Sequence, residues 1–287
     1  MAIVSYSREL STNKLKGVFL LDIAPVHHAA GMLVKGRRLN RLVERLDVAR
    51  DLPLETAYAI QKSATGLWDD QVAGWKIGRL PASVSGPGST PRFIGPIFSK
   101  SVRKLSGAIS RVPVLNEGQN AVEAEFIVRL AKPLGKTQPI MNHDFWLEHI
   151  AAIHVGVELA GNGLDVCDQS ISYIQIAAFG NNRGLLVGDR IPPHRYRWPL
   201  HVTTAIEGEI VGSLAVASPW NIVTTALGEA FEETKAFDTT FKAGHWVATG
   251  ALTGIHPIAC DQNAIVQFEG YDSIEMVTSD IRKWQDA

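Results

Sequence analysis

Apolar and polar positions repeat with different periods along the chain, and the change separates a mostly helical part from a mostly β part. Early in the sequence, apolar residues recur every three or four positions, as over 39–46, which is typical of amphipathic helices. Helices are expected over four segments: 26–46, 54–68, 142–151 and 219–235. Pro53 and Pro219 stand near the first turns of the second and fourth segments, and Asn142 and Ser218 are suitable N-caps.

From about residue 104 short β-rich runs predominate, and two of the helices interrupt them. They predict strands over six segments: 121–130, 152–160, 172–178, 184–187, 200–206 and 245–249. Residues 79–100 are expected to form a long loop, because Pro and Gly recur there. The predicted fold class is therefore α+β, with a smaller, partly helical N-terminal portion over 1–100 and a β-rich domain over 101–287.

Composition narrows the class of protein. The chain has 287 residues, 46% apolar and 20% charged, which is ordinary for a globular protein with a sizeable core. A net charge of −1 gives no reason to expect a nucleic-acid partner. Cys167 and Cys260 imply no disulfide framework and fit a reducing compartment. Because no secretory signal and no apolar run of membrane-spanning length is present, we expect a cytoplasmic protein without a membrane partner.

A short acidic alternation is the most informative chemical feature. Val122, Ala124 and Phe126 share one face of an expected strand, and Glu123 and Glu125 share the other. The two carboxylates then stand roughly 6–7 Å apart along the strand. Like charges this close raise each other's pKa unless a cation lies between them, and Mg²⁺ or Mn²⁺ prefers such oxygen ligands. The alternative is a solvated strand face.

Three further features lie elsewhere in the chain. On the strand expected over 152–160, His154, Gly156 and Glu158 share one face, so Glu158 can join the pair if the two strands are neighbours. Lys76 stands between glycines just before the expected loop, where it can bind a carboxylate or transfer protons. A Gly/Thr turn at 249–254 suits an oxyanion. Each has a simpler alternative: a surface carboxylate, a surface lysine and an ordinary turn.

Taken in order, several segments resemble the fumarylacetoacetate hydrolase superfamily, closest to its hydratase/decarboxylase branch with 2-oxopent-4-enoate hydratase. The matching segments are Ala57–Gln61, Gly74–Gly78, Val122–Glu125, Val157–Glu158, Leu186–Gly188 and Lys242–Gly254. The resemblance implies Glu123, Glu125 and Glu158 as ligands of Mg²⁺ or Mn²⁺ and Lys76 as an active-site residue. It also implies a distorted mixed β-roll with a smaller N-terminal portion, and a homo-oligomer.

Two segments depart from that branch. Members carry an acidic residue before a Tyr-Gly pair in the loop after the lysine, whereas this chain has Thr90–Pro96, which contains no acid. Members also show an Asp-Asn-Ala-Ser-like run, and here Phe179–Gly184 stands in its place. Arg92 and Asn182, from these two segments, are expected to contact the substrate together with Thr249 and Thr253 of the turn.

The function implied by the resemblance is a metal-dependent lyase that hydrates a 2-hydroxy-2,4-dienoate to a 4-hydroxy-2-oxo acid. One alternative is decarboxylation of a 2-oxo dicarboxylate, with Arg92 or Arg183 binding the second carboxylate. Hydrolysis of an acylpyruvate is disfavoured, because the N-terminal part has no well-placed Glu-His pair. The remaining alternative is a catalytically silent binding protein with the same fold, which the missing loop acid motivates.

Overall fold

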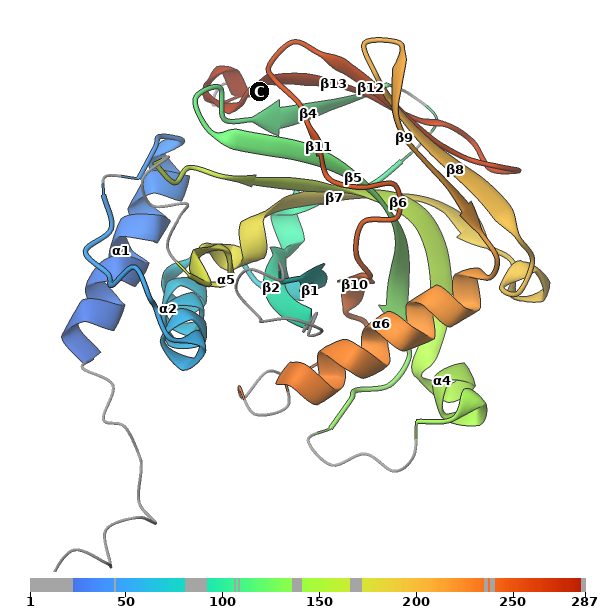
Figure 1. Ribbon diagram of the computed structural model, residues 1–287, viewed down its shortest axis with the longest axis horizontal. Helices are drawn as coiled ribbons and strands as arrows, with labels where there is room; N and C mark the ends of the chain where they lie inside the picture. Colours follow the sequence, from blue (N-terminus) through green and yellow to red (C-terminus); the bar gives the residue numbers. More distant parts are fainter. Residues whose placement is uncertain are drawn as a thin grey trace, which may run out of the picture.

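Two β-sheets form the body of the protein in the computed structural model, and helices α1 and α2 lie together beside them (Figure 1). The structure describes residues 23–43, 45–80, 92–105, 107, 109–135, 141–165, 172–234, 237 and 241–284. The predicted α+β class is confirmed, because a mixed β framework is combined with helices at both ends of the described chain and between strands. None of the described helices has the length and apolar character that crossing a membrane requires.

The larger sheet is eight-stranded and mixed, with the order β2-β1-β10-β5-β6-β7-β3, and β11 also pairs with β5. Its strands are β1 (Val72–Arg79), β2 (Arg92–Phe98), β3 (Val102–Lys104), β5 (Gln119–Leu130), β6 (Ile150–Asn162), β7 (Asn182–Ile191), β10 (Trp246–Ala248) and β11 (His256–Pro257). The parallel pairing of β1 with β10 brings together segments that are far apart in the sequence. Antiparallel pairing of β5 with β6 forms the centre of this sheet.

The smaller sheet is five-stranded, with the order β4-β13-β12-β8-β9. Its strands are β4 (Ser110–Val114), β8 (Leu200–Ile206), β9 (Glu209–Val216), β12 (Asn263–Phe268) and β13 (Ile274–Asp280). A two-residue turn joins β8 to β9, and Glu207 and Gly208 adopt φ angles of 51° and 82° there. Positive φ at both central residues matches the natural twist of a hairpin.

The helices are α1 (Ile23–Leu39), α2 (Leu54–Leu67), α4 (His143–His149), α5 (Ile174–Ala177) and α6 (Pro219–Thr234). Both predicted N-caps are confirmed: the Asn142 side chain accepts the Phe145 amide at 2.9 Å, and the Ser218 hydroxyl accepts the Asn221 amide at 3.3 Å. The first helix was predicted to reach residue 46 but ends at Leu39, because Asn40 adopts a left-handed φ of 50°.

Two other segments differ from the prediction. The loop predicted over 79–100 contains β2, whose residues are all buried, while 81–91 lie outside the described residues. Pro96 is tolerated there because β2 is the terminal strand of its sheet. The strand predicted over 172–178 is instead the short helix α5, since a brief buried apolar run has no period that distinguishes the two. Seven further strands were not predicted: β1, β3, β4, β9, β11, β12 and β13.

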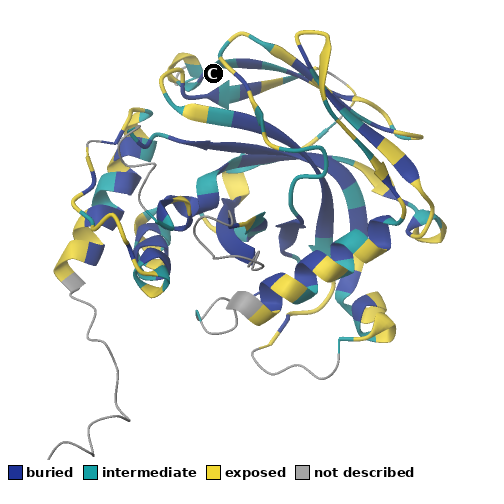
Figure 2. Cartoon of the chain, viewed as in Figure 1, coloured by how far each residue is buried: buried dark blue, intermediate teal, exposed yellow. Residues whose placement is uncertain are grey.

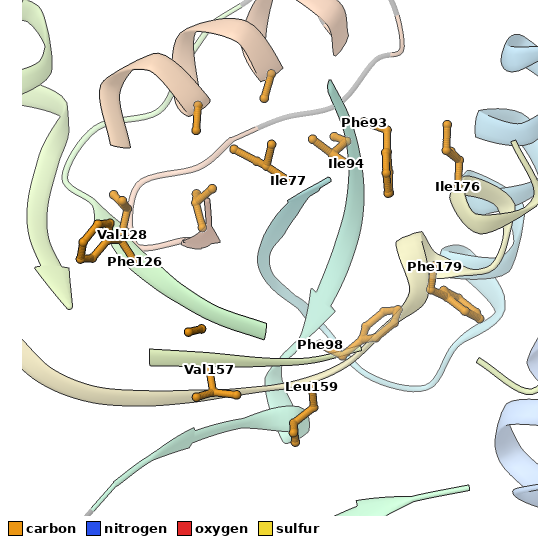
Figure 3. Packing of buried hydrophobic residues seen from close by; sticks show 14 of the residues in the cluster. Ile77, Phe93, Ile94, Phe98, Phe126, Val128, Val157, Leu159, Ile176 and Phe179 are labelled. Carbon is orange, nitrogen blue, oxygen red and sulfur yellow. The ribbon is translucent and has the colours of Figure 1, made fainter. Parts of the chain in front are cut away.

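Both faces of β5 are buried, and Figure 2 shows the central strands almost wholly dark blue. On one face Phe126 packs against Phe268 of the smaller sheet, with ring centroids 5.9 Å apart. On the other face Ile127 packs in a separate apolar cluster that includes Leu185 and Trp246. Figure 3 shows how the larger cluster gathers side chains from β2, β5 and β6. The face that carries Glu123 and Glu125 is therefore enclosed rather than solvated.

Candidate metal centre

Three glutamates converge on the enclosed face of the central strand pair. In the antiparallel register of β5 and β6, Glu123 lies directly opposite Glu158, and Glu125 lies opposite Gly156. One carboxylate oxygen from each glutamate lies within 4.8 Å of the others. Glu123 is 4% exposed, and Glu125 and Glu158 are fully buried. The alternation on one strand and the register with the next thus assemble a cluster of three carboxylates.

The free oxygens of this cluster favour a cation. Glu125 accepts the Gly250 amide at 2.8 Å through one oxygen, but its other oxygen has no hydrogen-bond partner. Glu158 accepts the Asn182 side-chain amide at 3.1 Å, and its second oxygen likewise has none. A buried acceptor without a donor costs about 1–3 kcal/mol. A six-coordinate hard cation satisfies these oxygens and leaves further positions open, so the donor set fits Mg²⁺ or Mn²⁺.

The electrostatics of the cluster point the same way. Burial raises the pKa of Glu123 to about 7, repulsion from Glu158 adds to the rise, and attraction to Lys76 opposes it. Burial also raises the pKa of Glu125 well above its ordinary value, and the charges of Glu158 and Glu123 raise it further. Protons therefore occupy the cluster near neutral pH unless a metal ion displaces them.

Lys76 belongs to the same cluster. Its ammonium nitrogen lies 3.4 Å from a Glu158 oxygen, and its side chain is almost fully buried. Burial by itself lowers the pKa of Lys76, but attraction to Glu158, Glu123 and Glu125 outweighs it and raises the pKa above its ordinary range. Lys76 is therefore an ammonium group in the metal-free protein, suited to donating a proton or binding a carboxylate rather than to acting as a base.

Two glycines enclose Lys76. Gly95 on β2 lies opposite Lys76 in the register, and a Cβ placed there would lie 2.5 Å from the Gly180 Cα. Gly180 has a φ of 64° and lies within the short 3-10 helix η3 (Phe179–Asn181). A Cβ on Gly180 would meet the Lys76 Cδ at 3.4 Å. The strand and the turn can therefore approach only because neither position carries a side chain. The sequence analysis placed Gly95 in a loop and assigned Gly180 to no element, so it missed this role.

Of the four residues predicted to contact substrate, Asn182 contacts the cluster, whereas Arg92 pairs with Glu229 of α6. Asn182 is fully buried, donates to Glu158, and leaves its own side-chain oxygen without a partner. Arg92 is 8% exposed and donates to Glu229 of α6 at 2.7 Å. A Cβ added to Gly250 would lie 3.3 Å from a guanidinium nitrogen of Arg92, so Arg92 passes close to this glycine. The amide of Gly250 donates to Glu125. The sequence analysis did not identify Glu229 or the Gly250 amide, because neither lies in a motif or pattern that would reveal its contact.

The two threonines have structural hydrogen bonds instead. The hydroxyl of Thr249 donates to the Phe126 carbonyl at 3.0 Å, which fastens the turn to β5. The hydroxyl of Thr253 contacts the Thr204 hydroxyl at 2.8 Å, which ties the turn to β8 of the smaller sheet. Their role as substrate contacts stays a prediction. His154, on the Glu158 face of β6, contacts the Gly188 carbonyl at 3.0 Å and lies outside the carboxylate cluster.

Comparison with known proteins adds structural neighbours but no sequence relatives. No protein-family model and no curated protein sequence matches the chain. The structure of 4-oxalocrotonate decarboxylase from Pseudomonas putida G7, complexed with calcium and acetate, superposes with a TM-score of 0.69 at 16% identity, covering 90% of this chain and 98% of that chain. The same enzyme complexed with magnesium and adipate gives the same values.

A second neighbour is 5-carboxymethyl-2-hydroxymuconate delta-isomerase from Mycobacterium smegmatis. It superposes with a TM-score of 0.50 at 14% identity, covering 74% of this chain and 81% of that chain. At such identities a likeness establishes the fold and not the activity. The chain therefore shares the fold of these two enzymes, and the fold class predicted from the sequence is confirmed.

Proposed function

We propose that the protein is a divalent-metal-dependent lyase that acts on a 2-oxo or 2-hydroxydienoic acid. The observation that carries the proposal is the convergence of three buried carboxylates, two of which retain an unpartnered oxygen, beside the ammonium of Lys76. Glu123, Glu125 and Glu158 are the residues that would hold Mg²⁺ or Mn²⁺. The magnesium and calcium complexes of the decarboxylase of similar fold support a divalent ion.

The reaction follows from what such a site stabilises. An ion held by the three glutamates would supply a Lewis acid that favours enolate charge on the substrate. Lys76, as a buried ammonium, holds the substrate carboxylate or delivers the proton that the developing carbanion needs. Asn182 holds Glu158 in place by donating its side-chain amide to it. The side-chain oxygen of Asn182 itself has no partner and is a further acceptor for a substrate hydroxyl. These residues form a site for stabilising an enolate rather than a site for nucleophilic attack.

Decarboxylation of a 2-oxo dicarboxylate is the reaction that this residue set supports best. In a 2-oxo-3-ene diacid the bond from C5 to the C6 carboxylate breaks, and its electron pair forms the C4–C5 double bond. The C3–C4 pair moves to C2–C3, the C2 carbonyl becomes an enolate oxygen, and carbon dioxide leaves. The step needs an electron sink and a proton donor but no base. Arg92, which lies near Gly250 and pairs with Glu229, would supply a cation for the second carboxylate.

Hydration of a 2-hydroxy-2,4-dienoate, the reaction that the sequence favoured, is the second candidate. A proton adds at C5 and water oxygen adds at C4, while the C2 hydroxyl loses its proton to become the 2-oxo group and C3 gains one, so the site must both accept and donate protons. The pKa of about 7 at Glu123 and the ammonium of Lys76 support this candidate. The two reactions differ in their substrates, because only decarboxylation requires a second carboxylate.

A Mg²⁺-dependent assay with matched mono- and dicarboxylate 2-oxo and 2-hydroxydienoic acids tests the proposal. We expect turnover that needs the added ion, that favours the dicarboxylate, and that disappears in Glu123→Gln/Glu125→Gln. Glu148→Gln, an exposed carboxylate paired with Lys132, is the control and should keep full activity. Turnover that survives in the double variant would refute metal chemistry at this cluster. If neither the wild type nor Lys76→Ala turned over any of the substrates, the alternative of a catalytically silent binding protein would be favoured.

A further inference from the structure

A pocket of about 430 Å³ lies where α1 meets the β3 and β7 end of the larger sheet. Five cationic side chains line it: Arg37, Arg38, Lys100, Arg103 and Arg183. Asp69 and Asp70 supply the carboxylates of its lining, so the lining has an excess of three positive charges. Leu159 of β6 also lines the pocket. Leu159 follows Glu158, and neighbouring residues of a strand point to opposite faces, so the pocket and the carboxylate cluster lie on opposite faces of β6.

These cations contact neutral groups. Four of them donate to backbone carbonyls: Arg37 to Asn182 at 3.0 Å, Arg38 to Leu67 at 2.8 Å, Lys100 to Asp69 at 3.2 Å and Arg103 to Arg111 at 2.6 Å. Within the described ranges, Arg183 donates no hydrogen bond, and none of the five forms an ion pair. The oxygens of Asp70 already accept from the Ser99 hydroxyl and the Lys100 amide.

Arg37 is held in place although its charge is poorly compensated. Its guanidinium lies 4.9 Å from the ring centroid of Phe179, 5.1 Å from that of Trp68 and 5.2 Å from that of Phe98. Figure 3 shows Phe98 and Phe179 side by side near Leu159. Burial lowers the pKa of Arg37 to about 9, the charge of Arg183 lowers it further, and attraction to Asp70 opposes both only in part. Burial also lowers the pKa of Arg183 to about 10. At neutral pH both remain charged, and an anion between them would relieve their repulsion.

We propose that this pocket binds a multiply charged oxyanion, either a phosphate ester or a polycarboxylate. Guanidinium groups bind phosphate and carboxylate oxygens in the same two-pronged geometry, so the two sources share one recognition chemistry. The pocket is large enough for a small metabolite, and its charge excess favours a multivalent anion over a monovalent one. The site is separate from the carboxylate cluster and does not depend on the reaction that the cluster performs.

Isothermal titration calorimetry on the Mg²⁺-loaded protein at low ionic strength tests the proposal. The probes are inorganic phosphate, propane-1,2,3-tricarboxylate and acetate. We expect phosphate or the tricarboxylate to bind at least tenfold more tightly than acetate, and the tighter of the two identifies the source. Arg183→Gln should weaken that binding at least tenfold. Arg190→Gln is the control, because Arg190 is an arginine of the same strand β7, but it is exposed, donates to the Ala151 carbonyl and does not line the pocket. Equal binding of all three anions, or wild-type binding by Arg183→Gln, would overturn the proposal.

Thermal unfolding gives a second readout that does not depend on activity. Without added anion, Arg183→Gln should unfold at the wild-type temperature or above it, because the substitution removes a like charge beside Arg37. With the anion, the wild type should gain stability and Arg183→Gln should not. Glu123→Gln/Glu125→Gln should bind the anion as the wild type does. If Glu123→Gln/Glu125→Gln lost anion binding and Arg183→Gln kept it, the anion would bind at the carboxylate cluster, which would contradict the proposal.

Discussion

Glu123→Gln is predicted to stabilise the metal-free protein while removing its response to metal. The substitution keeps the shape of the side chain and removes a carboxylate whose pKa is raised from 4.5 to about 7, chiefly by burial. One pKa unit corresponds to about 1.4 kcal/mol, so ionising Glu123 costs the folded state about 3 kcal/mol. For a chain of this length that difference is roughly 5 °C in the unfolding temperature.

The sign of the pH dependence follows from the same shift. Because the pKa of Glu123 is higher in the folded state than in the unfolded state, its protonated form favours folding. That contribution is fully present below about pH 4.5 and is lost as the pH rises through about 7. Wild type and Glu123→Gln should therefore have similar stability near pH 4.5, and the variant should be more stable by about 3 kcal/mol at pH 8.

Urea unfolding in the presence of a chelator, repeated from pH 4.5 to pH 8, measures this difference. Glu148→Gln is the control and should follow the wild type closely, because Glu148 is an exposed carboxylate. At a Mg²⁺ concentration of about 100 times Kd the wild type should gain about 3 kcal/mol and the variant should not. A metal-free Glu123→Gln protein that is less stable than wild type at pH 8 would refute the electrostatic reasoning.

Three other substitutions or conditions have defined outcomes. Mg²⁺ should bind about tenfold more weakly for each pH unit below 7, because protons on Glu123 compete with it, and a Kd that is constant from pH 5.5 to 8 in calorimetry would contradict this. Lys76→Met should lower kcat by about 100-fold or more while equilibrium dialysis still finds the ion bound, whereas wild-type turnover would exclude Lys76 from the chemistry. Gly95→Ala should cost about 1–3 kcal/mol in urea unfolding because its Cβ meets Gly180, and Gly66→Ala, whose Cβ meets nothing within 4 Å, should not destabilise the protein.

The sequence predicted which glutamates share a face of one strand, but not how the three carboxylates come together in the folded protein. The alternation over 122–126 correctly placed Glu123 and Glu125 on one face of a strand, because that pattern depends on one strand alone. Whether Glu158 joins them depends on the register of β5 with β6, which the alternation does not specify. Lys76 reaches the cluster through the pairing of β1 with β10, between segments about 170 residues apart, and only the resemblance predicted its presence.

Prediction failed where tertiary packing overrides a local signal. Pro96 and Gly95 are ordinary loop residues, yet they lie in a buried strand because β2 is terminal in its sheet and because Gly95 must approach Gly180. Strand β12 was missed although its buried residues alternate, since Ile265 on its outer face is also apolar and hides the period. The prediction of a solvated face as the alternative for Glu123 and Glu125 is wrong, because neighbouring elements cover both faces of β5.

A crystal structure of the protein soaked in Mn²⁺, with data collected at the manganese absorption edge, tests the central claim most directly. The account predicts one anomalous peak per chain, about 2.1 Å from oxygens of Glu123, Glu125 and Glu158. An empty cluster under saturating Mn²⁺, with Lys76 still in contact with Glu158, would contradict it.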